Sequence, residues 1–144
     1  MLIRRATAED AAAIEAIYAE ERNEERSVGT AYKQVDWASY VEIPHIVLLV
    51  LEDAGQIKGC LLGYDLFDWG FIELIVVRRD ARGHDAGERL VDEFLLVGKD
   101  RWAAAEMLVS PGDERLLRYT DRLGFTQKEA AVWCVKQLDD DARA

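Results

Sequence analysis

Three apolar segments that favour β-strands follow one another in the chain with only short turns between them. The first, Ile46–Leu51, is an unbroken apolar run, so we expect a strand in mid-sheet that is buried on both faces. Residues 53–55 separate it from a second segment at 57–66, and 68–70 lead into a third at 71–77. Because turns this short join antiparallel strands, the sequence predicts an antiparallel meander.

Helical patterns and further short strands lie on both sides of the meander. Thr7 and Asp10 form a cap pattern before the first helix, Pro44 follows the second, and Gly124 ends the last. The expected elements, besides the meander, are a strand at 2–5, helices at 11–18, 35–41, 87–102 and 111–124, and strands at 107–109 and 131–138. This order predicts one α/β (α+β) domain over residues 1–144, with a central, mixed, mostly antiparallel sheet flanked by helices.

The charge balance restricts the classes of partner. A formal net charge of −10 disfavours nucleic-acid binding and attracts a cationic small molecule or a basic peptide. Acidity that only maintains solubility is an equally good explanation. No apolar run has the length of a signal peptide or a membrane span, so we expect a cytoplasmic protein.

The two cysteines are expected to be buried filler rather than reactive or metal-binding groups. Cys60 and Cys134 lie far apart, each within an apolar, strand-like segment, and no Cys-x-x-Cys pair is present. With only two histidines in the sequence, a zinc site is not expected.

The segment from Val77 to Leu90 joins the end of a strand to the start of a long helix through a glycine-containing loop. Free N–H groups and the dipole at a helix start can hold a pyrophosphate. Residues 78–89 contain four arginines and three carboxylates, a local excess of positive charge in an acidic protein. The alternative is that the loop is only a connection between the two elements.

This loop carries a family resemblance. Arg82 opens and Gly87 closes a loop patterned Arg/Gln-x-x-Gly-x-Gly/Ala after a strand that ends in Val77, and Leu123-Gly124-Phe125 closes the last helix. In these motifs and in its element order, the sequence resembles the GNAT superfamily of acetyl-CoA-dependent N-acetyltransferases over nearly the whole chain.

The resemblance implies a function and a cofactor site. It implies transfer of an acetyl group from acetyl-CoA to a primary amine of a small molecule or peptide by direct attack. The residues implied in cofactor binding are Ile75, Val76, Val77, Arg82, Gly83, His84, Asp85, Ala86 and Gly87. The strand would pair with the pantetheine arm and the loop would hold the pyrophosphate.

Two side chains are candidates for proton transfer. Glu73 lies in an otherwise apolar strand, where partial desolvation would make its carboxylate a stronger general base, unless it faces water. The family's usual thiolate-protonating tyrosine is replaced by Thr120, and Tyr119 is one residue earlier on the helix. Tyr119 is therefore either the proton donor or a core residue, and bound water could also supply the proton.

The loop departs from the family pattern at two acidic residues. Asp85 replaces the first inner glycine and Glu88 follows the closing glycine, so both place negative charge near the expected pyrophosphate. Asp85 could also cap the helix and occupy the N–H groups that a phosphate needs. These departures favour an alternative function, a catalytically weak or inactive acyl-CoA-sensing or protein-interaction domain.

An acceptor pocket is expected from aromatic and acidic residues outside the loop. Aromatic faces combined with carboxylates suit a cationic amine, although each of these residues could equally be ordinary core or surface. The candidates are Trp37, Tyr40, Glu42, Asp65, Asp68 and Trp69. The exposed edge of the last expected strand could pair with a second copy, so a homodimer is also expected.

Overall fold

The computed structural model describes residues 1–22, 35–109, 111–132, 134 and 136. The chain divides into two compact units, Met1–Ser110 and Pro111–Ala144, which we call the sheet unit and the α4 unit and describe separately. The sheet unit contains, in its described residues, β1 (Leu2–Arg5), η1 (Ala8–Asp10), α1 (Ala11–Arg22), α2 (Trp37–Tyr40), β2 (Ile46–Asp53), β3 (Gln56–Asp65), β4 (Gly70–Val77), η2 (Arg79–Ala81), α3 (Ala86–Val97) and β5 (Ala105–Met107). The α4 unit contains α4 (Glu114–Arg122).

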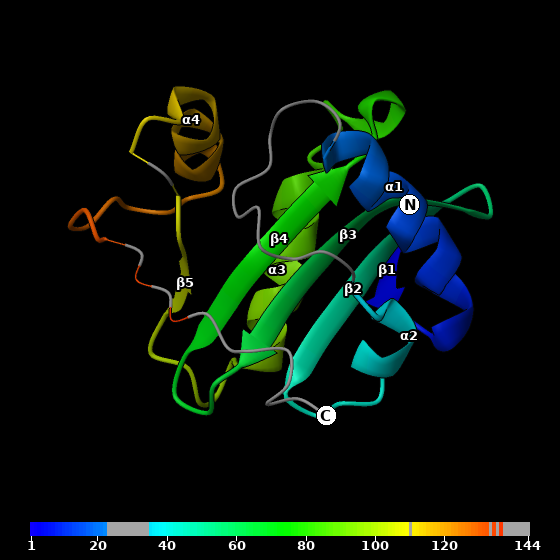
Figure 1. Cartoon of the computed structure of the whole chain (residues 1–144), viewed down its shortest axis with the longest axis horizontal. Coiled ribbons are helices and arrows are strands. Elements are labelled where there is room, and N and C mark those ends of the chain that lie inside the picture. The colour runs from blue at the N-terminus through cyan, green and yellow to red at the C-terminus, as the bar shows by residue number, and fades with distance from the viewer. Residues whose placement is uncertain (23–34, 110, 133, 135, 137–144) are drawn as a thin grey trace. The chain divides into compact units, whose positions relative to one another are not determined.

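The five strands form one sheet in the order β1-β2-β3-β4-β5 (Figure 1). Neighbours from β1 to β4 are antiparallel, and β5 runs parallel to β4. This arrangement confirms the predicted meander and the mixed, mostly antiparallel sheet. Ile46–Leu51 of β2 is buried throughout, because helices cover both faces of the sheet at this strand.

The first helix begins where the cap pattern predicts. The carboxylate of Asp10 accepts hydrogen bonds from the backbone N–H of Thr7 at 2.7 Å and from its hydroxyl at 3.2 Å. A short 3₁₀ turn precedes α1, and α1 extends beyond the predicted residue 18 to Arg22. The second helix, α2, is shorter than predicted and is capped by Asp36, whose carboxylate accepts from the N–H of Ser39 at 3.2 Å.

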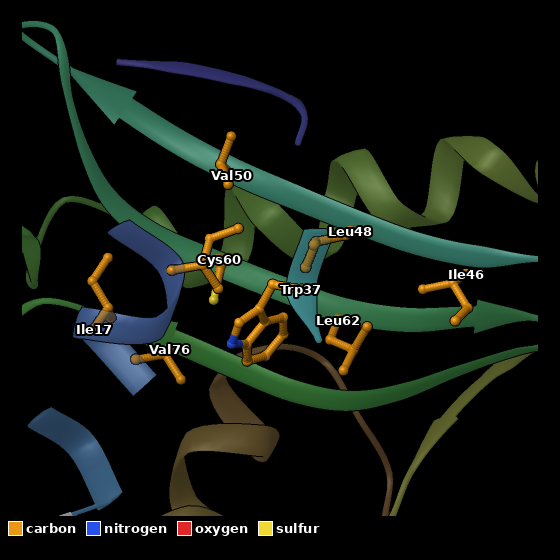
Figure 2. Close-up of a cluster of buried hydrophobic side chains, with 9 residues drawn as sticks. Ile17, Trp37, Ile46, Leu48, Val50, Cys60, Leu62 and Val76 are labelled. Carbon is orange, nitrogen blue, oxygen red and sulfur yellow. The ribbon is translucent and has the colours of Figure 1, made fainter. Parts of the chain in front are cut away.

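Helices α1 and α2 cover one face of the sheet and pack on a cluster of buried apolar side chains, which we call the front core (Figures 1 and 2). Trp37 of α2 points from its helix toward Cys60 and Leu62 of β3. The buried members of the front core are Ile14, Ile17, Trp37, Ile46, Leu48, Val50, Cys60, Leu62 and Val76. Burial raises the pKa of the Cys60 thiol to about 12, so this cysteine is the expected inert filler.

Helix α3 covers the opposite face of the sheet (Figure 1). Its inward side chains Leu90 and Phe94 are fully buried. The Phe94 ring occupies the space beside Gly63 of β3, where an added Cβ would lie 2.4 Å from the Phe94 Cε2 atom. A glycine is therefore required at this point for the helix to pack closely on the sheet.

Several predicted boundaries are wrong. Helix α3 ends at Val97 rather than at residue 102, because the chain turns at Gly98 and the Trp102 ring packs where a side chain at 98 would stand. Strand β5 begins two residues earlier than the predicted 107–109. In the predicted last strand, residues 131, 132, 134 and 136 are not in a strand, and the other four positions lie outside the described residues.

The α4 unit differs from the prediction at its cysteine and agrees with it at the last helix. Cys134 is exposed, so the prediction of two buried cysteines is wrong for this one. Helix α4 begins after Asp113, whose carboxylate accepts from the N–H of Leu116 at 3.0 Å, and Gly124 follows it with a φ of +89°. Within the parts of the chain that are described, no helix combines the length and the apolar character needed to span a membrane.

Candidate active site

One edge of β4 is only partly paired. Strand β3 pairs with β4 as far as Val77, whereas β5 pairs with it only at Gly70–Ile72. Among the described strands, none therefore pairs with the β5-side edge of β4 from Glu73 to Val77. An unpaired strand edge presents N–H and C=O groups to which an extended ligand with amide groups can bind. The predicted cofactor residues Ile75, Val76 and Val77 lie on this edge.

A β-bulge sits at the start of the unpaired edge. Leu62 of β3 pairs with Leu74, but the next residue, Gly63, pairs with Ile72, so Glu73 is the extra residue of β4. A bulge locally changes the direction of side chains, and here it places Glu73 half-buried with its carboxylate accepting a hydrogen bond from the Tyr64 hydroxyl. The candidate base is therefore at the point where β4 and β5 separate.

The loop after β4 turns sharply before α3 begins. Its opening residue, Arg82, folds back so that its Nε donates to the carbonyl oxygen of Val77 at 2.9 Å. Gly83 has a φ of +85° and Asp85 a φ of +55°, two left-handed residues that bring the chain to the first turn of α3 at Ala86. Gly83, His84 and Asp85 are exposed, whereas Ala86 and Gly87 are buried.

Asp85 does not cap α3. Its backbone is left-handed, and its side chain makes no capping hydrogen bond, so the competition considered from the sequence does not occur. The N–H groups of Ala86, Gly87 and Glu88 precede the first intrahelical hydrogen bond, which Arg89 donates to the Asp85 carbonyl at 2.9 Å. These groups fit an anion such as a diphosphate.

The left-handed backbone also explains why the family pattern has glycine at this position. A positive φ is strain-free for glycine, and aspartate is among the side chains that tolerate it best. Asp85 therefore preserves the turn while changing its charge.

Lys58 of β3 neutralises Asp80, an acidic residue of the loop after β4. Lys58 Nζ lies 2.5 Å from the carboxylate of Asp80, and Arg78 Nε lies 3.4 Å from it. The hydrogen bond from Lys58 holds the pKa of the Asp80 carboxyl below its ordinary value. Lys58 was not predicted, because its contact depends on the β3–β4 register rather than on proximity in sequence.

The predicted acceptor residues separate into two groups. Trp37 and Tyr40 of α2 do come together, with ring centroids 6.2 Å apart, and the ring of Tyr18 of α1 also packs on Trp37, at a centroid distance of 5.6 Å. The Trp37 Nε1–H donates to Glu15 at 2.6 Å, and its ring is buried in the front core. Trp37 is thus a core residue, and Glu42 is exposed beyond the end of α2.

The second group lies at the β3–β4 turn, where the Asp65 carboxylate makes structural hydrogen bonds. Its carboxylate accepts from Arg101 at 2.5 and 3.0 Å, from Trp102 Nε1 at 3.0 Å and from the N–H of Phe67 at 3.0 Å. The hydrogen bonds from Arg101 hold the pKa of Asp65 well below its usual range. Three of these bonds, from Arg101 and Trp102, tether the turn to the segment before β5, whereas the sequence suggests either an acceptor pocket or ordinary surface for Asp65.

The same tether includes backbone hydrogen bonds. The N–H of Ala103 donates to the Asp68 carbonyl at 2.8 Å, and the N–H of Gly70 donates to the Ala104 carbonyl at 3.0 Å. Asp68 and Trp69, also expected in the acceptor pocket, are exposed side chains of this turn.

Tyr119 and Thr120 belong to the α4 unit. The Arg122 guanidinium lies 5.6 Å from the centroid of the Tyr119 ring, and the Thr120 hydroxyl donates to the Leu117 carbonyl at 2.9 Å. The role of Tyr119 as a proton donor stays a prediction.

Comparisons with known proteins agree on the fold. The acetyltransferase (GNAT) family matches residues 11–125. Solved structures with a similar fold include an aminoglycoside N-acetyltransferase, AAC(6′)-Iy, in complex with CoA, with a TM-score of 0.76, 14% identity and coverage of 95% of this chain and 100% of that chain. No curated protein matches the chain.

Two further structures show the same similarity of fold. An aminoglycoside acetyltransferase from an uncultured soil metagenomic sample, in complex with sisomicin, has a TM-score of 0.76 at 12% identity and covers 96% of each chain. A ribosomal-protein-alanine N-acetyltransferase from Brucella melitensis has a TM-score of 0.67 at 17% identity and covers 96% of this chain and 99% of its own. With the family match running from α1 to the residue after Gly124, the chain belongs to the acetyltransferase (GNAT) family.

Proposed function

We propose that this protein is an N-acetyltransferase that transfers an acetyl group from acetyl-CoA to a primary amine of a small molecule or peptide in the cytoplasm. The observation that carries the proposal is the position of Glu73 at the bulge where the unpaired edge of β4 begins. That edge leads directly into the loop and the uncapped start of α3. A base, a strand edge and an anion site therefore follow one another along a single stretch of chain.

The proposed cofactor site has two parts, the start of α3 and the edge of β4. The N–H groups at the start of α3, with Arg82 nearby in sequence, would hold the diphosphate of CoA, and the backbone of Ile75–Val77 would pair with the amides of its pantetheine arm. Acetyl-CoA supplies an acetyl group already activated as a thioester. Lys58 supports this assignment because it neutralises Asp80 and so lowers the negative charge of the loop.

Glu73 is proposed as the general base. An amine is protonated near neutral pH and must lose a proton before its lone pair can attack a carbonyl carbon. The Glu73 carboxylate, or a water molecule held by it, would accept that proton. Direct attack by the amine requires no covalent intermediate with the protein.

The acceptor is proposed to be cationic. The formal net charge of −10 attracts a protonated amine over long range. Two of the structural neighbours are aminoglycoside acetyltransferases, one in complex with sisomicin, which supports an amine-bearing acceptor.

A second candidate function, acyl-CoA sensing without efficient catalysis, is favoured by three side chains. Asp85 and Glu88 place negative charge at the anion site, and Thr120 stands where the family has a tyrosine. Calorimetric titration with CoA and a turnover assay together distinguish the two functions, because a sensor binds CoA without releasing thiol from acetyl-CoA.

The test is thiol release from acetyl-CoA over a panel of amines, with Glu73→Gln compared with Glu93→Gln. Glu93 is an exposed residue of α3, and its variant is the matched loss of one carboxylate. We expect Glu73→Gln to lower kcat by about 100-fold or more, in the range for general-base catalysis, with CoA affinity retained, and Glu93→Gln to behave as wild type.

Each other outcome has a defined meaning. A wild-type rate for Glu73→Gln removes Glu73 from the mechanism. Absence of thiol release with every amine, with CoA bound, favours the sensing function. Absence of CoA binding at millimolar concentration contradicts both functions.

A further inference from the structure

We infer that Tyr64 is a positioning residue that orients the Glu73 carboxylate for proton transfer; this inference rests on the proposed function. Tyr64 lies on β3, one strand away from Glu73, and its hydroxyl donates a hydrogen bond to Glu73 Oε2. The pair does not belong to the cofactor loop, and no motif in the sequence indicates it.

The bulge makes such a partner necessary. In a regular antiparallel ladder each side chain is flanked by a directly opposed residue, which restricts its orientation. Glu73 has no directly opposed residue, because Leu62 pairs with Leu74 and Gly63 pairs with Ile72. A hydrogen bond from elsewhere in the sheet is then what limits the rotamers of Glu73.

Tyr64 is held rigidly enough to provide that restraint. It pairs with Phe71 across the sheet, and the two rings are tilted by 30° with centroids 6.4 Å apart. The half-buried Tyr64 ring also packs against the front core. From this position it is the diagonal cross-strand neighbour of Glu73, within reach for a long side chain. The hydroxyl is therefore fixed by the packing of its ring.

The hydrogen bond has one chemical effect. It occupies Oε2, so that Oε1 is the oxygen with full capacity to accept a proton from the amine or from a bound water. Tyr64 therefore acts through Glu73.

The central experiment compares kcat and KM of Tyr64→Phe, which removes the hydroxyl and keeps the ring, with those of wild type. We expect kcat to fall by about 10-fold because the carboxylate is less well oriented, with KM for acetyl-CoA within about twofold of wild type. A fall in kcat without a change in KM is the signature of a positioning role, because binding of acetyl-CoA does not depend on the orientation of Glu73.

Two controls separate positioning from general destabilisation. Tyr64→Phe introduced into Glu73→Gln should change kcat by less than about twofold, since residues that act through one another are not additive. Tyr18→Phe removes the hydroxyl of a second tyrosine whose side chain packs against the same front core, and it should leave kcat unchanged. An equal fall of kcat in Tyr18→Phe would show a nonspecific effect and overturn the inference.

A measurement independent of turnover completes the test. The ¹³C chemical shift of the Glu73 carboxyl, measured by NMR at neutral pH, should differ from wild type in Tyr64→Phe and should be unchanged in Tyr18→Phe. An unchanged chemical shift and an unchanged kcat in Tyr64→Phe, in a protein in which Glu73→Gln is impaired, would overturn the role of Tyr64 alone. A wild-type rate for Glu73→Gln would instead overturn the proposed base.

Discussion

Asp85 has the backbone conformation that its loop requires and a negative charge that would repel the proposed anionic ligand. Its left-handed φ of +55° is the conformation that the turn requires, and its side chain leaves the N–H groups of α3 uncapped. Its charge nevertheless stands at the site proposed for a diphosphate. Substitutions at Asp85 can therefore change the charge of the loop separately from its backbone conformation.

We expect Asp85→Asn and Asp85→Gly both to tighten CoA binding. At about 4 Å, one like-charge contact costs about 1 kcal/mol in water-like surroundings and about 4 kcal/mol at an effective dielectric constant of 20, so a gain of roughly fivefold or more is expected. Stability should change by less than about 1 kcal/mol, because in Asp85→Gly the relief of backbone strain at a positive φ is offset by a larger loss of chain entropy on folding. Isothermal titration calorimetry and thermal melts measure both; tightening in Asp85→Gly alone would identify the backbone, rather than charge, as the cause.

The two thiols are expected to differ sharply in reactivity. Cys60 is fully buried and its thiol pKa is raised to about 12, so its thiolate is scarce at neutral pH, whereas Cys134 is exposed. A maleimide at pH 7 should label one cysteine quickly in the folded protein and the second only after denaturation. Peptide mapping by mass spectrometry identifies the site, and rapid labelling of Cys60 in folded protein would contradict its burial.

At the scale of elements, the sequence predicts which helices and strands exist better than it predicts the residues at which they end. The strand at Ile46–Leu51 was predictable because this apolar run is short and rich in β-favouring residues, which suits a strand covered on both faces. The end of α3 was not predictable, because Leu95 and Leu96 continue the apolar pattern up to Gly98. What ends that helix is the Trp102 ring against Gly98, a contact that depends on the tertiary fold.

The contact between α3 and the sheet gives a prediction at this scale. Gly63→Ala would place a Cβ 2.4 Å from the Phe94 ring and 3.0 Å from the Phe71 carbonyl oxygen, beside the bulge. We expect a loss of about 1–3 kcal/mol of unfolding free energy from overpacking. Gly112→Ala is the control, since nothing lies within 4 Å of its added Cβ. Denaturant unfolding measures both, and equal stability of the two variants would contradict the close approach of α3.

At the scale of the whole molecule, the proposed site combines predictable and unpredictable parts. The loop 82–87 and Glu73 could be named from the sequence, because a strand–loop–helix motif is local. Tyr64 and Lys58 could not, because the first reaches Glu73 only through the β3–β4 register and the second reaches Asp80 in the same way. The structural role of Asp65 could not be named either, because its partners, Arg101 and Trp102, lie more than thirty residues away.

Acid sensitivity belongs to the molecule as a whole, because two carboxylates in different parts of the sheet unit, Asp10 and Asp65, are held ionised by arginines. Hydrogen bonds from Arg4 lower the pKa of Asp10, and those from Arg101 lower the pKa of Asp65. A carboxyl whose pKa is lower folded than unfolded contributes stability that is present above its unfolded value, about 4, and is lost as the pH falls below it.

We therefore expect Tm to be steady between about pH 5 and 7 and to fall steeply below about pH 4. Asp65→Asn should lower Tm at pH 7 and reduce the steepness of the acid limb, whereas Asp92→Asn, at an exposed position on α3, should do neither. Differential scanning calorimetry across this range is the measurement. An acid limb of equal slope in Asp65→Asn and wild type would exclude the Asp65–Arg101 pair as a source of the acid sensitivity.

The tether at Asp65 has a consequence for ligand binding. Three donors on Arg101 and Trp102 hold the segment that leads into β5 against the β3–β4 turn. This segment is therefore ordered before a ligand arrives. We expect a ligand that pairs with the edge of β4 to lose little of its interaction energy to ordering the start of β5.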